Sequence, residues 1–275
     1  MKWLFVLLLA VVIFGGAAFF SYDLFVKPEQ TMRAEQTGQI ATPPPADVSL
    51  PEFQAAARLR QDGKLSECRD ALVLFLQKYP SGQHSEEAKD LLGDLNMQIL
   101  LSDYPSPEKQ EYIVRSGDVI NRVAQKTKTT PELIMKINQL DSTMLRIGER
   151  LWIAHPEFAL FIQRKPQVVI LLNHGAFFKQ YHIRAVKLPA KQPPRLNTKV
   201  AEVLAWRAGK RVGLGSREYR EAIHWIRFAQ AGYTLFVEPP TNDAPPAGSG
   251  LGLAAKDLDE LSSLVNTKTA VTITD

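Results

Sequence analysis

The sequence predicts a multidomain fold, in which an N-terminal transmembrane helix precedes a short all-α segment, a compact βααβ unit and a mainly-β C-terminal domain. Three observations predict it. Residues 3–20 form an uncharged apolar run, apolar residues recur at helical spacing between residues 51 and 102, and alternating strand patterns occur throughout residues 157–275. The unit at residues 111–154 combines strand and helix patterns in one short stretch.

Bulk composition places few limits on function. The chain has 275 residues, of which 45% are hydrophobic, and a formal net charge of +4. These values are ordinary for two or more globular domains, although mild basicity suits an anionic polymer or a lipid surface. Because Cys68 is the only cysteine, the sequence excludes an intrachain disulfide and a multi-cysteine zinc site. We expect no cofactor, no metal and no nucleic-acid partner.

Residues 1–26 are predicted to be an uncleaved signal anchor. The apolar run approaches the ~20 residues that span a bilayer. A cleaved signal peptide is the alternative, since residues 15–18 are small, but bulky aromatic residues follow at once and no lipobox cysteine is present. With Lys2 in the cytoplasm, the rest of the chain would lie outside it. Residues 27–50, which include Pro43-Pro44-Pro45, then form a linker.

Residues 51–102 carry the apolar pattern of three helices, separated at Gly63-Lys64 and at Tyr79-Pro80-Ser81-Gly82. The pattern G-K-L-x-E-C…F-L-x-x-Y-P-x-G…A-x-x-L-L-G resembles the tetratricopeptide-like repeats of bacterial envelope proteins. In that family a small residue packs between helices at the position of Cys68, so the resemblance implies a buried packing residue and not a catalytic thiol. Because about one and a half repeats fall short of the three that usually form a solenoid, we expect an envelope protein partner, a tandem neighbour or a spacer role.

Residues 111–154 give the most specific pattern in the chain. A short strand, two helices and a second strand follow in order. Asp118 is expected to cap the first helix, Thr130 to cap the second with Pro131 in its first turn, and Gly148 to turn the chain into the last strand. The motifs Y-x-V-x-x-G-D at the start and G-x-x-L-x-I at the end resemble the LysM domain.

The LysM resemblance implies binding of the N-acetylglucosamine backbone of peptidoglycan or chitin, in a shallow groove between the loop before the first helix and the loop after the second. Val119 stands where the family usually has threonine, so the resemblance implies one weaker polar contact. Structural roles are the alternative, with Asp118 as a helix cap and Asn138 as a helix end. Carried onto this chain, the groove residues are Gly117, Asp118, Val119 and Ile120 on one side and Asn138, Gln139, Leu140, Leu145 and Ile147 on the other.

Residues 157–275 are predicted to form a β-rich domain, with a helix at 256–265 and a long Pro- and Gly-rich loop at 238–252. The opening F-A-L-F-I-Q…V-V-I-L-L-N-H-G and the closing D-L-D-E-L-S-S-L-V-N-T-K-T-A-V-T-I-T resemble the L,D-transpeptidase domain of bacterial cell-wall enzymes. Predicted strands lie at residues 158–162, 168–172, 177–185, 199–206, 222–229, 233–237 and 269–274.

The L,D-transpeptidase family catalyses acyl transfer with a cysteine thiolate, a histidine that activates it and a group that orients the histidine. Aligned on the closing motif, Gly250 stands at the cysteine, Gly248 at the histidine, Gly252 at the arginine and Phe236 at a second histidine. The resemblance therefore implies a pseudoenzyme without catalytic residues, which binds stem peptides or a partner protein.

The alternative is a divergent L,D-transpeptidase or a hydrolase with an unrecognised nucleophile. Ser249 is the nearest hydroxyl to the vacant position, and His182 with His224 would have to act on it or hold a metal ion.

The resemblances together imply a peptidoglycan-binding envelope protein, anchored as a single-pass protein in the bacterial inner membrane with its soluble part in the periplasm or facing the cell wall. The expected partners are peptidoglycan, the membrane and an envelope protein bound through the helical segment.

Overall fold

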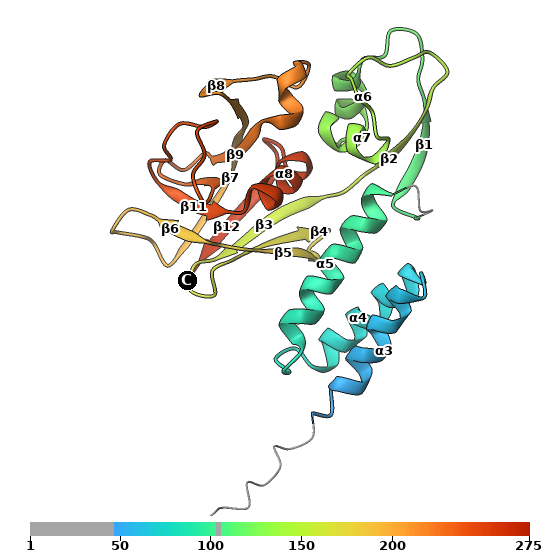
Figure 1. Cartoon of the computed structure of the whole chain (residues 1–275), viewed down its shortest axis with the longest axis vertical. Coiled ribbons are helices and arrows are strands. Elements are labelled where there is room, and N and C mark those ends of the chain that lie inside the picture. Colours follow the sequence, from blue (N-terminus) through green and yellow to red (C-terminus); the bar gives the residue numbers. More distant parts are fainter. Residues whose placement is uncertain (1–46, 103–105) are drawn as a thin grey trace, which may run out of the picture. The chain divides into compact units, whose positions relative to one another are not determined.

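Three helices form the N-terminal part of the described chain, as predicted: α3 (Leu50–Gln61), α4 (Leu65–Lys78) and α5 (Ser85–Leu101). The computed structural model describes residues 47–102 and 106–275 (Figure 1). The predicted anchor and nearly all of the linker therefore lie outside the described residues. Within the described ranges, no helix combines the length and the apolar character needed to cross a bilayer.

Cys68 is a packing residue of these helices, as predicted. Its side chain is fully buried, and the thiol donates a hydrogen bond to the carbonyl oxygen of Ala56 at 3.2 Å. It lies in a hydrophobic cluster with Phe53, Leu72 and Phe75. Burial is the largest influence on the thiol and raises its pKa, which is the opposite of what a reactive cysteine requires.

Helix α5 packs on strand β5 (Ala176–His182) of the C-terminal domain. Gly93 permits the close approach, because a Cβ there would lie 2.8 Å from Cγ of Lys179. The Asn96 amide also donates to the carbonyl oxygen of Phe178 at 2.7 Å. The helical segment therefore belongs to the same compact unit as the rest of residues 49–275. The envelope protein partner for this segment remains a prediction.

The βααβ unit forms as predicted. Strand β1 (Lys109–Ile113) pairs antiparallel with β2 (Arg150–Ala154), and α6 (Ile120–Lys126) and α7 (Pro131–Ile137) connect them. Thr130 caps α7, since its hydroxyl oxygen accepts from the Leu133 amide at 3.0 Å. The core of the unit consists of Val114, Ile120, Val123, Ala124, Ile134, Leu151 and Ile153.

The predicted cap at Asp118 is wrong by one residue. Val119 precedes α6, and no side chain caps that helix. The Asp118 carboxylate instead accepts from the Tyr112 hydroxyl at 2.8 Å and from the Arg115 amide at 2.9 Å. These contacts close the turn before the helix, and the carboxylate makes no capping hydrogen bond to α6.

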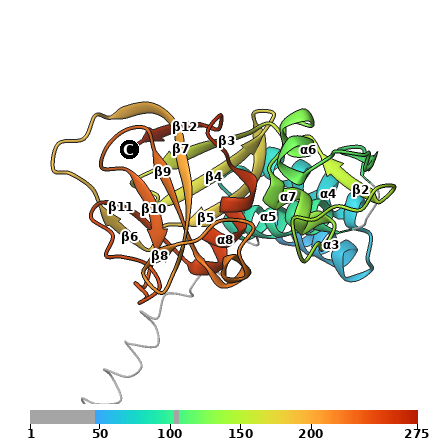
Figure 2. The same cartoon turned by 90° about the horizontal axis from the view of Figure 1, so that it is seen from above.

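The C-terminal domain is mainly β, as predicted, and rests on one long sheet with strand order β5-β4-β3-β12-β7-β9-β10-β11-β6, to which β8 is added beside β7 (Figure 2). Helix α8 (Ala255–Leu264) packs on β9 and β10. The strand bounds are β3 (Phe158–Gln163), β4 (Val168–Asn173), β6 (Ala185–Lys187), β7 (Arg195–Arg207), β8 (Lys210–Arg211), β9 (Ile223–Phe228), β10 (Thr234–Val237), β11 (Gly250–Leu253) and β12 (Ala270–Thr274).

The loop predicted for residues 238–252 is wrong at its end. Strand β11 begins at Gly250 and pairs parallel to β10, with Leu251 opposite Leu235. Its other edge pairs with β6, so the backbone of this glycine-containing strand is bonded on both sides despite low intrinsic β-propensity. The predicted strand at 177–185 is likewise two elements, β5 and β6, and the short helix η2 (Arg217–Glu221) was not predicted.

Candidate functional site

Two loops meet at one end of the small sheet in the βααβ unit. The Gly148 amide donates to the carbonyl oxygen of Val114 at 2.8 Å, and the Val114 amide donates to that of Glu149 at 2.9 Å. The loop at residues 115–119 begins at this junction, and the loop at 138–149 returns to it. The two predicted sides of the sugar groove are therefore brought to the same end of the unit.

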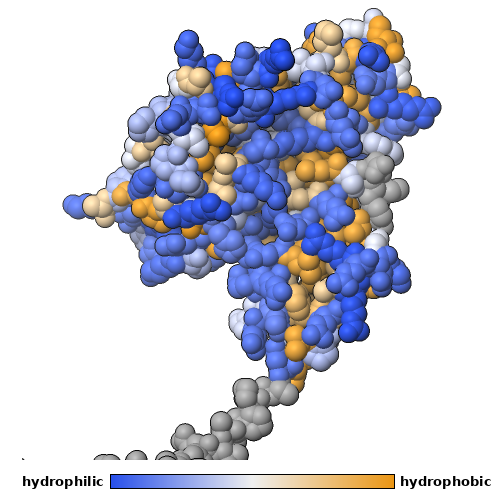
Figure 3. Space-filling model, in the orientation of Figure 1, coloured by the Kyte–Doolittle hydropathy of each residue, from blue (hydrophilic) through white to orange (hydrophobic). Residues whose placement is uncertain are grey.

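Exposed apolar side chains mark these loops. Val119 is 53% exposed and Ile147 is 73% exposed, and the unpredicted Met144 is 82% exposed. Figure 3 shows apolar side chains at the surface of this part of the molecule, at the upper right, among hydrophilic ones. Gly117 has a positive φ of +84° that a non-glycine residue would adopt with strain. The loops therefore present apolar groups that a ligand can cover.

The other predicted groove residues differ in how far their side chains are exposed. Ile120 is buried in the core of the unit, while Leu140 and Leu145 are partly buried against it. Gln139 is exposed and has a positive φ of +52° just after α7. Asp118 is held in the turn described above, where the hydrogen bond from the Arg115 amide lowers the pKa of its carboxyl group.

Asn138 joins the end of α7 to β2. Its side-chain amide donates to the carbonyl oxygens of Ile134 and Trp152, each at 2.8 Å, and its oxygen accepts from the Trp152 amide at 2.7 Å. The side chain is thus engaged by backbone groups and positions the second loop rather than facing a ligand.

Three of the four positions that lack catalytic side chains, Gly250, Gly252 and Phe236, are tightly packed. Gly250 has a φ of +145°, and a Cβ there would lie 1.9 Å from the carbonyl oxygen of Thr234. At Gly252 a Cβ would lie 2.8 Å from Cβ of Glu238, and Phe236 is 1% exposed. At Gly248 nothing lies within 4 Å of such a Cβ. A cysteine at Gly250 therefore requires the backbone to move.

A pocket of about 420 Å³ lies beside Phe236, lined also by Trp225, Lys187 and residues of the 240–247 loop. The Lys187 ammonium lies 5.0 Å from the centroid of the Phe236 ring and 3.3 Å from the Glu238 carboxylate. The lining contains no cysteine and no histidine, so the thiol and imidazole groups of a cysteine acyl transferase are not present in this pocket.

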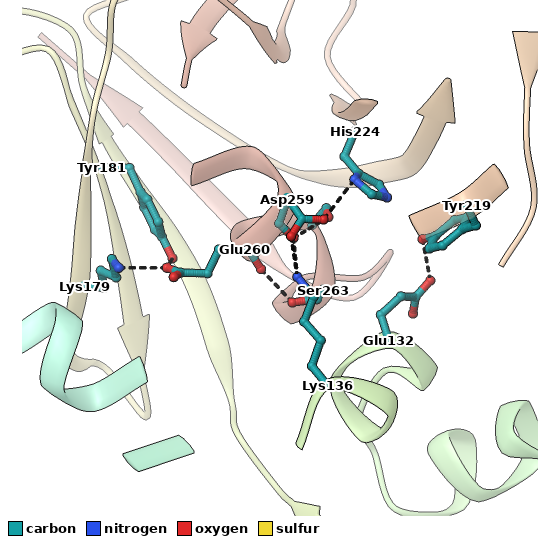
Figure 4. Close-up of polar contacts among 10 residues, drawn as sticks. Glu132, Lys136, Lys179, Tyr181, Tyr219, His224, Asp259, Glu260 and Ser263 are labelled. Atoms are coloured by element: carbon teal, nitrogen blue, oxygen red, sulfur yellow. Dashed lines mark hydrogen bonds and ion pairs between the residues drawn. The ribbon is translucent and has the colours of Figure 1, made fainter. Parts of the chain in front are cut away.

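Acidic residues of α8 connect the C-terminal domain to the two preceding segments (Figure 4). Glu260 accepts a hydrogen bond from the Tyr181 hydroxyl at 2.8 Å and pairs with Lys179 at 2.9 Å. Lys179 also pairs with Asp94 of α5 at 2.9 Å. Burial and the Glu260 charge raise the pKa of Tyr181 well above its usual value, so the phenol stays protonated.

Asp259 faces the opposite way, toward the βααβ unit. Its carboxylate accepts from Lys136 of α7 at 2.8 Å and lies 3.4 Å from Nδ1 of the buried His224. Burial raises the pKa of this carboxyl group, but the contacts with His224 and Lys136 outweigh it and lower the pKa to about 2. The carboxylate is thus ionised at every physiological pH.

A second pocket, of about 340 Å³, opens where α7, α8 and the segment around η2 meet. It is lined by Glu132, Met135, Lys136, Gln139, Leu140, Asp141, Leu214, Tyr219, Arg220, His224, Asp259, Ser262 and Ser263.

The βααβ unit matches a known family in both its pattern and its fold. Residues 112–154 match the family model described as the LysM domain. This segment is a LysM domain. No curated protein sequence matches the chain.

Solved structures of L,D-transpeptidases are similar to the C-terminal region at low identity. The enzyme from Mycobacterium smegmatis is 12% identical with a TM-score of 0.31, over 46% of this chain and 64% of that one. Those from Stackebrandtia nassauensis and Enterococcus faecium are 13% and 12% identical with TM-scores of 0.32 and 0.30, over 43% and 42% of this chain and 56% and 49% of theirs. The chain thus spans less than two thirds of each, and likeness at this level assigns it no chemistry.

The alternative nucleophile lacks a catalytic partner. The Ser249 hydroxyl donates to the carbonyl oxygen of Gly232 at 2.9 Å. His182 lies 3.3 Å from Asp90 of α5, and His224 lies 3.4 Å from Asp259 of α8. These contacts of the two histidines therefore do not include the pairing on Ser249 that this alternative requires. Among residues 47–102 and 106–275, no group of three or more His, Cys, Asp or Glu side chains is arranged to hold a metal ion.

The contact surface between the LysM domain and the C-terminal domain, here called the seam, was not predicted from the sequence. It includes Lys136, Tyr219, His224 and Asp259, and long stretches of chain separate most of these residues. No spacing rule connects them, because α7, η2, β9 and α8 come together only in the folded chain.

Proposed function

We propose that this protein binds peptidoglycan through its LysM domain and that its C-terminal domain does not catalyse the cysteine acyl transfer of the L,D-transpeptidases that it resembles. The match of residues 112–154 to the LysM domain carries the first part. The exposed side chains of Val119 and Ile147 support it, because apolar groups on shallow loops can pack against the apolar faces of N-acetylated sugars.

The packing at Gly250 supports the second part. An acyl-transfer cysteine must project its sulfur into a space that a substrate carbonyl can enter. Here the carbonyl group of Thr234 fills the space that a Cβ of residue 250 would need. The neighbouring Ser249 hydroxyl donates a hydrogen bond to the carbonyl oxygen of Gly232.

The proposal includes an anchor in the bacterial inner membrane, with the soluble part in the periplasm or facing the wall. Residues 3–20, which contain no charged side chain, support it. We expect the intact chain to stay in membranes after an alkaline wash and the chain without residues 1–26 to be released. Release of the intact chain would contradict the proposed anchor.

Co-sedimentation of the full-length chain with insoluble peptidoglycan tests the binding function. Ile147→Ser is expected to weaken binding by about three- to tenfold, because it removes an exposed apolar contact on the groove loop. The measurement is the bound fraction over a range of protein concentrations.

Ile113→Ser is the matched control. Ile113 is another exposed isoleucine of the LysM domain, at 53% exposure, but its neighbours Tyr112 and Val114 face the core, so its side chain lies on the other face of the strand. Equal loss of binding in both variants, or no sedimentation of the unaltered chain, would contradict the proposal.

A further inference from the structure

The pocket between α7, α8 and η2 shares two residues with the predicted sugar groove. Gln139 and Leu140 belong both to the second side of that groove and to the lining of the pocket. The C-terminal domain supplies Leu214, Tyr219 and Arg220 to the same lining. At about 340 Å³, the pocket falls within the roughly 300–1,000 Å³ of small-molecule sites.

Leu214 is an apolar side chain that packs into none of the hydrophobic cores of the described residues. It lies in the segment Gly213-Leu214-Gly215 between β8 and η2, and a Cβ at either glycine would meet no atom within 4 Å. It is half-buried and belongs to none of the hydrophobic clusters formed by the described residues. A leucine that lines a pocket without packing into a core is available to a ligand.

Polar contacts fix this wall against the LysM domain. The Tyr219 hydroxyl donates to the Glu132 carboxylate at 3.0 Å, and the Arg220 guanidinium donates to the Asp141 carboxylate at 2.5 Å. The Tyr219 ring also packs edge-on against His224, with 5.2 Å between centroids. The pocket is therefore shaped before a ligand arrives, which lowers the entropic cost of binding.

The charges of the lining disfavour an anionic ligand. Its lysine and its arginine, Lys136 and Arg220, are each paired with a carboxylate, of Asp259 and Asp141, and His224 also faces Asp259. Glu132 adds a further acidic group. No cation is left over for a phosphate or a carboxylate, whereas Leu140 and Leu214 suit an acetamido methyl group and the polar groups suit hydroxyls.

We propose that the C-terminal domain extends the sugar groove, so that an uncharged N-acetylated saccharide lying on Gln139 and Leu140 continues into this pocket and contacts Leu214 and Arg220. The inference rests on the proposed function of the LysM domain. On this inference, Leu214 and Arg220 of the C-terminal domain help to determine which saccharide binds. Tight binding then requires a saccharide longer than the LysM groove alone would hold.

Calorimetric titration of the full-length chain with the disaccharide and the hexasaccharide of N-acetylglucosamine tests this inference. Leu214→Ser is expected to weaken binding of the hexasaccharide by about 5- to 20-fold, since it removes an apolar contact without opening a core. Arg220→Gln, on the pocket rim at 57% exposure, is expected to weaken it in the same direction.

The matched controls are Val186→Ser, a 44%-exposed apolar residue of β6 outside the pocket, and Arg217→Gln, an exposed arginine of η2 that does not line it. Both are expected to bind like the unaltered chain, and thermal unfolding verifies the fold of each variant. Unchanged affinity in Leu214→Ser and Arg220→Gln, while Ile147→Ser still weakens binding, would overturn the inference and leave the proposed function standing. No binding of either saccharide by the unaltered chain would overturn both.

Discussion

At the scale of single residues, Gly250 shows why the vacant catalytic position is not simply a truncated side chain. Its φ of +145° is rarely adopted by residues with a Cβ, and the space that a Cβ would need is filled by the Thr234 carbonyl. The glycine is therefore required by the parallel pairing of β10 and β11. Gly248, two residues earlier, has open space around it and no such requirement.

Replacing these two glycines by alanine separates the roles of the positions. Gly250→Ala is expected to lower the free energy of unfolding by about 2–4 kcal/mol, because the backbone must shift to admit the methyl group. Gly248→Ala is expected to change it by less than about 0.5 kcal/mol. Urea unfolding measures both; equal stabilities for the two variants would show that the strand tolerates a side chain at Gly250.

At the scale of elements, α8 is the connection between the three described segments. Glu260 faces β5 and, through Lys179, reaches α5, while Asp259 reaches α7 (Figure 4). The Thr130 hydroxyl, beside α7, also donates to the carbonyl oxygen of Ser263. One helix with charged side chains on two faces thus holds the LysM domain and α5 to the sheet.

The lowered pKa of Asp259 makes this connection sensitive to acid. Since the pKa is about 2 in the folded chain against an ordinary 3.8, the ionised carboxylate stabilises the fold above about pH 4, and the contribution is lost as the pH falls toward 2. Asp259→Asn is expected to be less stable than the unaltered chain at pH 7, with the gap narrowing between pH 4 and pH 2. Unfolding midpoints across that range measure the effect. A stability difference between the two proteins that stays constant from pH 4 to pH 2 would show that protonation of Asp259 does not affect folding.

At the scale of the whole molecule, residues 49–275 form one unit in which the LysM domain and the C-terminal domain share a seam. The polar contacts of Tyr219 and Arg220 with the LysM domain join surfaces that separate modules would leave exposed. The two domains are therefore packed together, and the proposed wall binding is tested on the full-length chain rather than on an isolated LysM module.

The proposed lack of acyl transfer is also tested at this scale. Incubation of the full-length chain with muropeptides is expected to give neither cross-linked nor trimmed products, since the Ser249 hydroxyl is hydrogen-bonded to the carbonyl oxygen of Gly232 and Gly250 has no room for a side chain. Mass spectrometry of the mixture is the measurement. Turnover that disappears in Ser249→Ala would show that the domain is an enzyme with an unfamiliar nucleophile.

Local patterns predicted most elements correctly for a physical reason. Helical spacing in residues 51–102, the Thr130 cap with Pro131 and the alternation at residues 158–173 each depend on interactions within a few residues. The Asp118 cap failed because a tyrosine six residues earlier in the chain competes for the carboxylate. Strand β11 was missed because its residues are suited to a strand only when β10 and β6 lie on either side.

The sequence by itself determined that this chain carries a LysM pattern, a buried cysteine at position 68 and no cysteine at position 250, because these are matters of residue identity and short-range spacing. Tertiary structure alone decided that Gly250 has no room for a side chain and that Leu214, Tyr219 and Arg220 lie beside the LysM loop. Such contacts join residues separated by tens of positions, and only the packing of α7, α8 and η2 brings them within reach.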